Sequence, residues 1–187
     1  NSYTASNNLP GLISSIANSV GDYVNFQTSL IGGSTLQNHT NDSNTINLIM
    51  DGNWDYVVLQ EQSQYPSFPL WQVEEEVFPY ANQLSEIINQ YNECADVVFF
   101  LTWGRENGDQ SNCENWPPVC TYEGMDDLLR ERYLIMANQN DAQVSPVGAV
   151  WRYIRDAEYD IDLYNSDGSH PSFLGSYVAA VCFYTTF

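Results

Sequence analysis

Short apolar runs that alternate with longer amphipathic segments constrain the fold of this chain most strongly. Residues 56–59 and 97–101 are continuous apolar runs, which are typical of strands buried on both faces. Residues 143–147 are a weaker strand candidate, and residues 24–30 alternate apolar and polar side chains. The pattern therefore predicts four short strands.

Apolar residues at helical spacing occupy the intervals between these runs. The expected helices are residues 9–20, 73–91, 125–136 and 171–187, the last with Pro171 in its first turn. Strands that alternate with helices imply right-handed crossovers and a parallel sheet with helices on both faces. We therefore expect residues 1–187 to form one α/β domain, a three-layer α/β/α sandwich.

In such sheets, ligands bind at the carboxyl ends of the strands. This rule brings together the loops at residues 32–33, 60–63 and 102–107 and the turn near Asp167. We expect any reactive side chains to lie among these four loops.

Histidine is the most common base at neutral pH, and the chain has only His39 and His170. His170 follows Asp167 by three residues, in Asp-Gly-Ser-His-Pro. In a tight turn, an aspartate at this spacing can orient the imidazole so that its other nitrogen activates a hydroxyl group. The same spacing is also typical of an Asx turn that caps the final helix, and spacing alone leaves both interpretations open.

The net charge of −19 excludes some partners. All five basic residues are arginines, set against 24 acidic residues. A field of this sign repels phosphate backbones, so we expect no nucleic-acid partner. No window approaches the roughly 18 apolar residues of a membrane span.

Four cysteines indicate a disulfide. Cys113 and Cys120 enclose six residues with two prolines, a loop that a disulfide can close. No Cys-x-x-Cys pair occurs, so we expect no metal site. Cys94 and Cys182 either pair or remain buried thiols.

Two glycosylation sequons begin at Asn38 and Asn41. Together with the expected disulfide, they favour a secreted or extracellular glycoprotein.

Four blocks stand in order along the chain: Asn-Ser-Tyr-Thr at 1–4, Gly-Gly-Ser-Thr-Leu-Gln-Asn-His at 32–39, Trp-Asp-Tyr-Val-Val-Leu-Gln-Glu-Gln-Ser at 54–63 and Asp-Gly-Ser-His-Pro-Ser at 167–172. The set resembles the motif blocks of SGNH/GDSL-type serine hydrolases, in a divergent branch whose first block is Gly-Asn-Ser-Tyr-Thr. The resemblance spans nearly the whole chain. It implies the SGNH hydrolase fold, with a flavodoxin-like parallel sheet, and no cofactor.

The resemblance also implies roles for particular residues. Ser2 is the expected nucleophile, His170 the base and Asp167 the group that orients His170. The implied activity is that of a serine esterase acting on small acyl esters, including acetyl esters of carbohydrate. The alternative is a non-catalytic SGNH-like module that binds glycan or protein in an extracellular assembly.

Backbone N–H groups of Ser2 and Gly33 are the oxyanion-hole donors that the resemblance implies. The family's third donor is an asparagine within Gly-x-Asn-Asp, which this sequence lacks. Gln60 is the expected replacement because it ends its strand, with Gln62 as the alternative.

Two residues after the 97–101 strand are candidate substrate contacts. Trp103 is expected to line a sugar-binding wall. Arg105 either clamps a substrate carboxylate or pairs with Glu106 or another surface acid.

The sequence pattern at both ends is that of a truncated domain. A doubly wound domain of this type opens with a buried strand that leads into the nucleophile turn, whereas this sequence begins at the turn and stops at Phe187 without a clear helix stop. We expect a sheet without its first strand, which upstream residues supply or a second chain supplies by self-assembly or as a partner.

Overall fold

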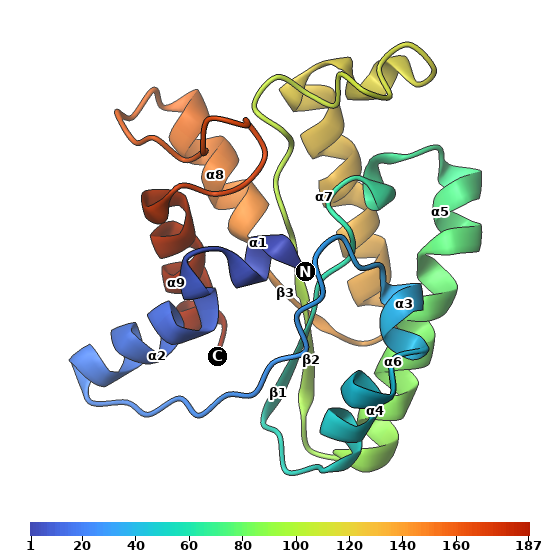
Figure 1. The fold of residues 1–187 in the computed structure, drawn as a ribbon, viewed down its shortest axis with the longest axis vertical. Helices are drawn as coiled ribbons and strands as arrows, with labels where there is room; N and C mark the ends of the chain where they lie inside the picture. The colour runs from blue at the N-terminus through green and yellow to red at the C-terminus, as the bar shows by residue number, and fades with distance from the viewer.

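A three-stranded parallel sheet lies between two layers of helices in the computed structural model, which describes residues 1–187 (Figure 1). Its strands are β1 (Tyr56–Leu59), β2 (Asp96–Phe100) and β3 (Gln143–Ser145), in the order β1-β2-β3. The register pairs Val57 with Val97 and Phe99 with Val144. The α/β sandwich and three of the four predicted strands are thereby confirmed.

Alternate side chains of β2 enter two separate hydrophobic cores. Val97 and Phe99 belong to one cluster, and Val98 and Phe100 belong to the other. The first cluster is covered by α3 (Leu36–Thr40), α4 (Ser43–Met50), α5 (Leu70–Glu76), α6 (Phe78–Tyr91) and α7 (Tyr122–Gln139). The second is covered by α1 (Ser2–Ala5), α2 (Leu9–Val20), α8 (Val147–Asp156) and α9 (Phe173–Thr186). The central strand is therefore buried on both faces, as its continuous apolar run predicts.

Short 3₁₀ helices complete the element order: η1 (Ser6–Asn8), η2 (Tyr65–Ser67) and η3 (Pro117–Cys120). No helix combines the length and the hydropathy that a membrane-spanning segment requires. Helices α1, α3, α4 and α8 were not expected from the sequence.

Two helix boundaries differ from the prediction. The expected helix at residues 73–91 is two helices, α5 and α6, which are separated at Val77, whose φ of −122° and ψ of −60° are not helical. Pro79 lies in the first turn of α6. Backbone N–H groups in a first turn have no acceptor within the helix, so a proline there costs no helical hydrogen bond. Helix α9 begins at Phe173, and Ser172 caps it by accepting a hydrogen bond from Gly175 N. Pro171 therefore precedes the cap.

The strand predicted at residues 24–30 is wrong. This segment follows an open path between α2 and α3 (Figure 1) and contains no strand. None of residues 23–30 exchanges a backbone–backbone hydrogen bond. Phe26 and Leu30 are 40% and 38% exposed. The alternating pattern is present, but a strand also requires a hydrogen-bonded partner, and this segment has none.

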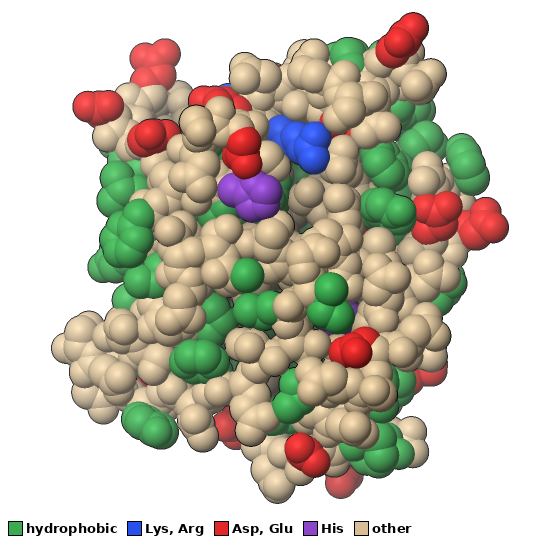
Figure 2. Space-filling model, in the orientation of Figure 1, with side chains coloured by type: hydrophobic (Ala, Val, Ile, Leu, Met, Phe, Trp, Pro, Cys, Tyr) green, Lys and Arg blue, Asp and Glu red, His purple; other side chains and the backbone are tan.

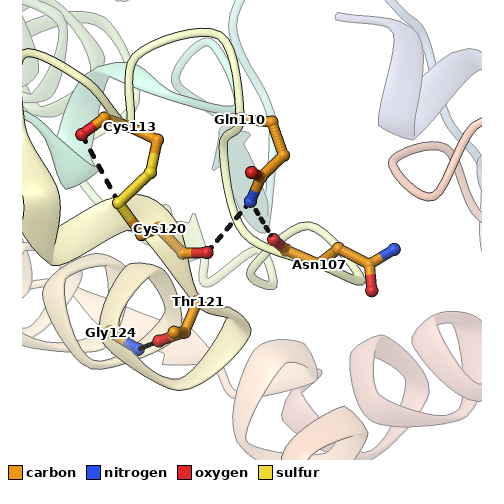
Figure 3. Close-up of a disulfide and its surroundings, with 6 residues drawn as sticks. All are labelled: Asn107, Gln110, Cys113, Cys120, Thr121 and Gly124. Carbon is orange, nitrogen blue, oxygen red and sulfur yellow. Dashed lines mark hydrogen bonds between the residues drawn. A yellow bond between two sulfur atoms is a disulfide. The ribbon is translucent and has the colours of Figure 1, made fainter.

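The predicted disulfide between Cys113 and Cys120 is confirmed (Figure 3). Gln110 Nε2 donates to the carbonyl oxygen of Cys120, which joins the closed loop to the preceding segment. Cys94 is exposed and Cys182 is buried, and neither forms a disulfide.

Candidate active site

Helix α1 and the loop before α9 bring three predicted side chains together. Ser2 is the first residue of α1, and His170 lies 168 residues further along the chain. The distance between Ser2 Oγ and His170 Nε2 is 3.0 Å, and the distance between His170 Nδ1 and Asp167 Oδ2 is 2.6 Å. The imidazole is thus in contact with a hydroxyl group on one side and a carboxylate on the other.

The Asp167 carboxylate also holds the turn in which His170 lies. Its Oδ1 accepts hydrogen bonds from the backbone N–H groups of Ser169 and His170, each at 2.9 Å. Partial burial acts to raise the pKa of Asp167, but hydrogen bonds from His170 and Ser169 outweigh it and hold that pKa below its ordinary value. The Asx turn and the contact with the imidazole are therefore made by different oxygens of one ionised carboxylate.

Tyr3 connects the serine and histidine segments. Its hydroxyl is 2.8 Å from Ser169 Oγ, and its ring meets the His170 ring edge to face at 5.6 Å between centroids. Trp103 Nε1 donates to Ser169 O at 3.0 Å. These contacts fix the base loop relative to α1.

Trp103 does not line a sugar-binding wall, so that expectation is corrected. Its side chain is fully buried and is stacked between Tyr3 and Trp151, with centroid distances of 4.6 Å and 3.7 Å. The loop after β2 directs the indole into the core between α1 and α8.

Asn1 is a site residue that the sequence analysis did not single out. Its side chain is buried, and Nδ2 donates to the carbonyl oxygens of Ser34 and Glu61 at 3.4 Å and 3.0 Å. Its Oδ1 accepts from Tyr3 N and from Gln60 Nε2. One side chain thus ties the Ser2 turn to the loops after β1 and before α3.

Both N–H groups of the Gln60 amide are in use, whereas the Gln62 amide uses one of its two. Gln60 Nε2 donates to Asn1 Oδ1 and to Glu61 O, while its Oε1 accepts from Thr4 Oγ1 at 2.6 Å. Gln62 Nε2 donates to Gln64 Oε1 at 3.1 Å. As an oxyanion donor, Gln60 would therefore have to leave an existing hydrogen bond, whereas Gln62 keeps one N–H unused.

Two backbone N–H groups near the serine are free. Gly33 N donates to no protein acceptor, and Ser2 N stands at the start of α1, where no helical acceptor exists. Gly33 has a φ of +68°, a conformation that favours glycine. The neighbouring Ser34 carbonyl is bonded to Asn1, which places this loop against the serine turn.

Glu61 is a second site residue that the sequence analysis missed. Its side chain is fully buried and accepts hydrogen bonds from Leu36 N, at 3.2 Å to each carboxyl oxygen, and from Gln62 N. Burial raises its pKa to about 8, against hydrogen bonds from Gln62 and Leu36 and the charge of the amino terminus, which lower it. This carboxyl group joins the start of α3 to the loop after β1.

Arg105 pairs with an acid, which was one of its two expected roles. Arg105 Nη1 lies 3.0 Å from Asp109 Oδ1. Asp109 is fully buried and also accepts from Gln64, Ser111 and Asn112, so the acid is an internal one and not a surface group. The Arg105 side chain as a whole is 25% exposed.

No protein-family model matches the chain, and no curated protein matches it. Solved structures do match. A candidate SGNH hydrolase from Slackia heliotrinireducens is 25% identical, with a TM-score of 0.79 over 99% of this chain and 94% of that chain. A candidate GDSL-like lipase from Parabacteroides merdae is 12% identical, with a TM-score of 0.64 over 95% of this chain and 79% of that chain. An acetylxylan esterase from Geobacillus stearothermophilus is 16% identical, with a TM-score of 0.58 over 94% of this chain and 77% of that chain.

A parallel sheet between two helical layers, with serine, histidine and aspartate in contact beside it, is an arrangement found in serine hydrolases with α/β folds. Within that class, this chain has the fold of the SGNH/GDSL superfamily, as the four sequence blocks indicated.

Proposed function

We propose that this protein is a serine esterase that hydrolyses small acyl esters. The observation that carries the proposal is the continuous contact from Ser2 Oγ through the His170 ring to Asp167, at 3.0 Å and 2.6 Å. The similarity to solved hydrolases and esterases supports the same reaction class.

The geometry suits a two-step acyl transfer. Ser2 Oγ attacks the ester carbonyl while its proton passes to His170 Nε2, and His170 then returns that proton to the leaving alcohol. A water molecule, deprotonated by the same nitrogen, attacks the acyl-serine, and His170 returns that proton to Ser2 Oγ as the carboxylic acid leaves. Asp167, kept ionised, holds the Nδ1–H tautomer and stabilises the imidazolium.

Backbone N–H groups of Ser2 and Gly33 are the proposed donors to the oxyanion, each worth roughly 3 kcal/mol in the transition state. Gln60 takes a different role from the one its position suggested. Through its hydrogen bond to Asn1 Oδ1, it fixes the residue that precedes the nucleophile. Gln60 is thus a positioning residue in this proposal, and Gln62 organises its own loop.

A short acyl group, with acetyl on carbohydrate as the first candidate, is the proposed substrate. Support comes from the similarity to an acetylxylan esterase. Burial of Trp103 removes the aromatic wall that the sequence suggested for a sugar. We propose a secreted protein, glycosylated at Asn38 and Asn41, because the disulfide is present and both asparagines are exposed.

A non-catalytic binding module is the competing function. It would not require a serine hydroxyl held at hydrogen-bond distance from an oriented histidine, so the Ser2–His170 contact favours the enzyme.

The test is hydrolysis of p-nitrophenyl acetate, butyrate and octanoate by the purified chain. We expect turnover to fall with acyl length, and Ser2→Ala and His170→Ala to lower kcat at least about 1,000-fold. Ser15→Ala, at an exposed serine on α2, is the matched control and should be unchanged. Activity that survives Ser2→Ala would contradict the proposal.

A further inference from the structure

Glu61 is a carboxyl group inside the protein without a cation bound to it. On the face shown in Figure 2, acidic side chains lie on the surface, whereas Glu61 has no exposed area. The arginines and His170 pair with other acids, and Glu61 takes part in no ion pair. Burying a carboxyl group without an opposite charge is costly. Natural proteins tolerate such costs mainly at functional sites.

The hydrogen bonds of the Glu61 carboxyl group come from backbone N–H groups of two loops. Leu36 N lies 3.2 Å from each carboxyl oxygen, and Gln62 N donates to Oε1. Leu36 is the first residue of α3, where backbone N–H groups have no acceptor within the helix. Glu61 therefore holds the start of α3 against the loop after β1.

The backbone of Glu61 is itself fixed on two sides. Its N–H donates to the Tyr133 hydroxyl at 3.2 Å, and its carbonyl oxygen accepts from Asn1 Nδ2 at 3.0 Å. Tyr133 is fully buried in α7, and Asn1 directly precedes Ser2. The carboxyl group thus extends from a backbone that is bonded both to the core and to the nucleophile turn.

The loop at residues 32–35 contains Gly33 N, the proposed oxyanion donor. Ser34 N donates to Ile31 O at 3.2 Å, which closes a turn within the loop. This local hydrogen bond shapes the loop but does not set its distance from Ser2. Contacts with distant parts of the chain must set that distance.

Only two hydrogen-bonding contacts join residues 32–36 to distant parts of the chain. One runs from Asn1 Nδ2 to Ser34 O at 3.4 Å, which is longer than an ordinary N–H···O hydrogen bond. The other is the contact of Leu36 N with both oxygens of Glu61. The Glu61 contact is therefore the stronger of these two restraints on the loop.

We propose that Glu61 is a positioning residue for the oxyanion hole, which fixes Gly33 N relative to Ser2 through the start of α3. This inference rests on the proposed esterase function and deepens it. Without the carboxyl acceptor, the loop moves and Gly33 N no longer reaches the oxygen that gains charge in the transition state. Ground-state binding of the ester depends little on this donor, so kcat falls and KM changes little.

The test compares Glu61→Met with Glu61→Gln. Methionine is similar in size but is a weak acceptor, whereas glutamine keeps an amide oxygen for Leu36 N or Gln62 N. The substrates are p-nitrophenyl acetate and p-nitrophenyl thionoacetate, in which sulfur replaces the carbonyl oxygen. Sulfur accepts hydrogen bonds weakly, so an oxyanion donor accelerates hydrolysis of the ester more than that of the thionoester. The ratio of the two kcat/KM values therefore reports on the oxyanion hole.

This ratio does not depend on the folded fraction, because both substrates are assayed with the same enzyme sample. A merely structural role for Glu61 would lower both rates equally and leave the ratio unchanged. Asp126→Ala is the matched control, since Asp126 is also a buried carboxyl group and accepts from Gly104 N in the loop after β2. Glu61→Ala is measured in place of Glu61→Met if the methionine variant is insoluble.

We expect Glu61→Met to lower kcat for the ester about 100-fold or more, the effect of losing one oxyanion donor, with KM within about threefold of the original. The ratio of ester to thionoester should fall at least about tenfold in Glu61→Met, and stay within about threefold of the original in Glu61→Gln and Asp126→Ala.

An unchanged ratio in Glu61→Met, or an equal fall in Asp126→Ala, would overturn the proposal. An equal fall in Glu61→Gln would overturn it as well, because the lost acceptor would then not be the cause. Failure of the proposed function has a different result, namely ester hydrolysis that survives Ser2→Ala.

Discussion

Replacing Glu61 by glutamine should remove a loss of stability that occurs as the pH rises. The Glu61 carboxyl group is fully buried, and burial raises its pKa to about 8, compared with an ordinary value of 4.5. Between these two values the native state holds a proton that the unfolded chain has released. The unfolded state then binds fewer protons, so the free energy of unfolding falls as pH increases.

The size of the effect follows from the two pKa values. From 4.5 to about 8, at 1.36 kcal/mol for each pH unit, the Glu61 contribution is at most about 5 kcal/mol. This contribution is fully present below pH 4.5 and is lost as the pH passes 8. Glutamine keeps an oxygen acceptor for Leu36 N or Gln62 N and does not ionise. Glu61→Gln should therefore gain several kcal/mol relative to the original protein between pH 5 and pH 9.

The assay is urea unfolding, followed by tryptophan fluorescence at pH values from 5 to 9, with the difference between the two proteins as the quantity of interest. Titration of shared groups that do not interact with Glu61 cancels in this difference; the amino terminus does interact with Glu61, so its titration contributes to the difference as well. Glu123→Gln makes the same charge change at an exposed position of α7 and is the matched control. A difference that stays constant within about 0.5 kcal/mol across the range would refute the reasoning.

Three further predictions concern the site and the disulfide. Asp167→Asn should lower kcat about 1,000-fold or more with little change in KM, because an amide does not hold the imidazole in the reactive tautomer. A loss of less than about tenfold in steady-state kinetics would contradict this prediction. Gln60→Ala should lower kcat by about tenfold or more, because it removes the hydrogen bond to Asn1 Oδ1, and Gln62→Ala should lower kcat less. The reverse order would argue against the positioning role of Gln60. Cys113→Ser should cost about 2.5 kcal/mol, the loop-closure value for about eight residues; an unchanged urea midpoint would exclude that contribution.

The central fold was predictable because β2 buries a continuous apolar run and a second apolar run marks β1. Helix α3 was not, since five residues are too few to show a period, and its start depends on a capping box between Thr35 and Asn38. The segment at residues 24–30 shows the opposite case. Its alternation is clear, yet whether such a segment becomes a strand depends on a neighbour that no local pattern specifies.

The site was predictable where a short motif carries the chemistry. Asp167 and His170 are neighbours in sequence, and their contact follows from one turn. Asn1 and Glu61 were missed because their hydrogen bonds join loops 25 to 60 residues apart, and only the fold brings these loops together. Trp103 was misassigned for the same reason, since nothing in a loop sequence states whether an indole faces solvent or core.

Covalent labelling of Ser2 tests the central claim most directly. An alkyl fluorophosphonate is incubated with the protein at pH 7.5, and the product is analysed by intact mass and peptide mapping. A serine oxygen activated by His170 attacks phosphorus and fluoride leaves, so we predict one adduct, located at Ser2 and absent from His170→Ala. An unlabelled protein, or an adduct on another serine with Ser2 unmodified, would contradict the account.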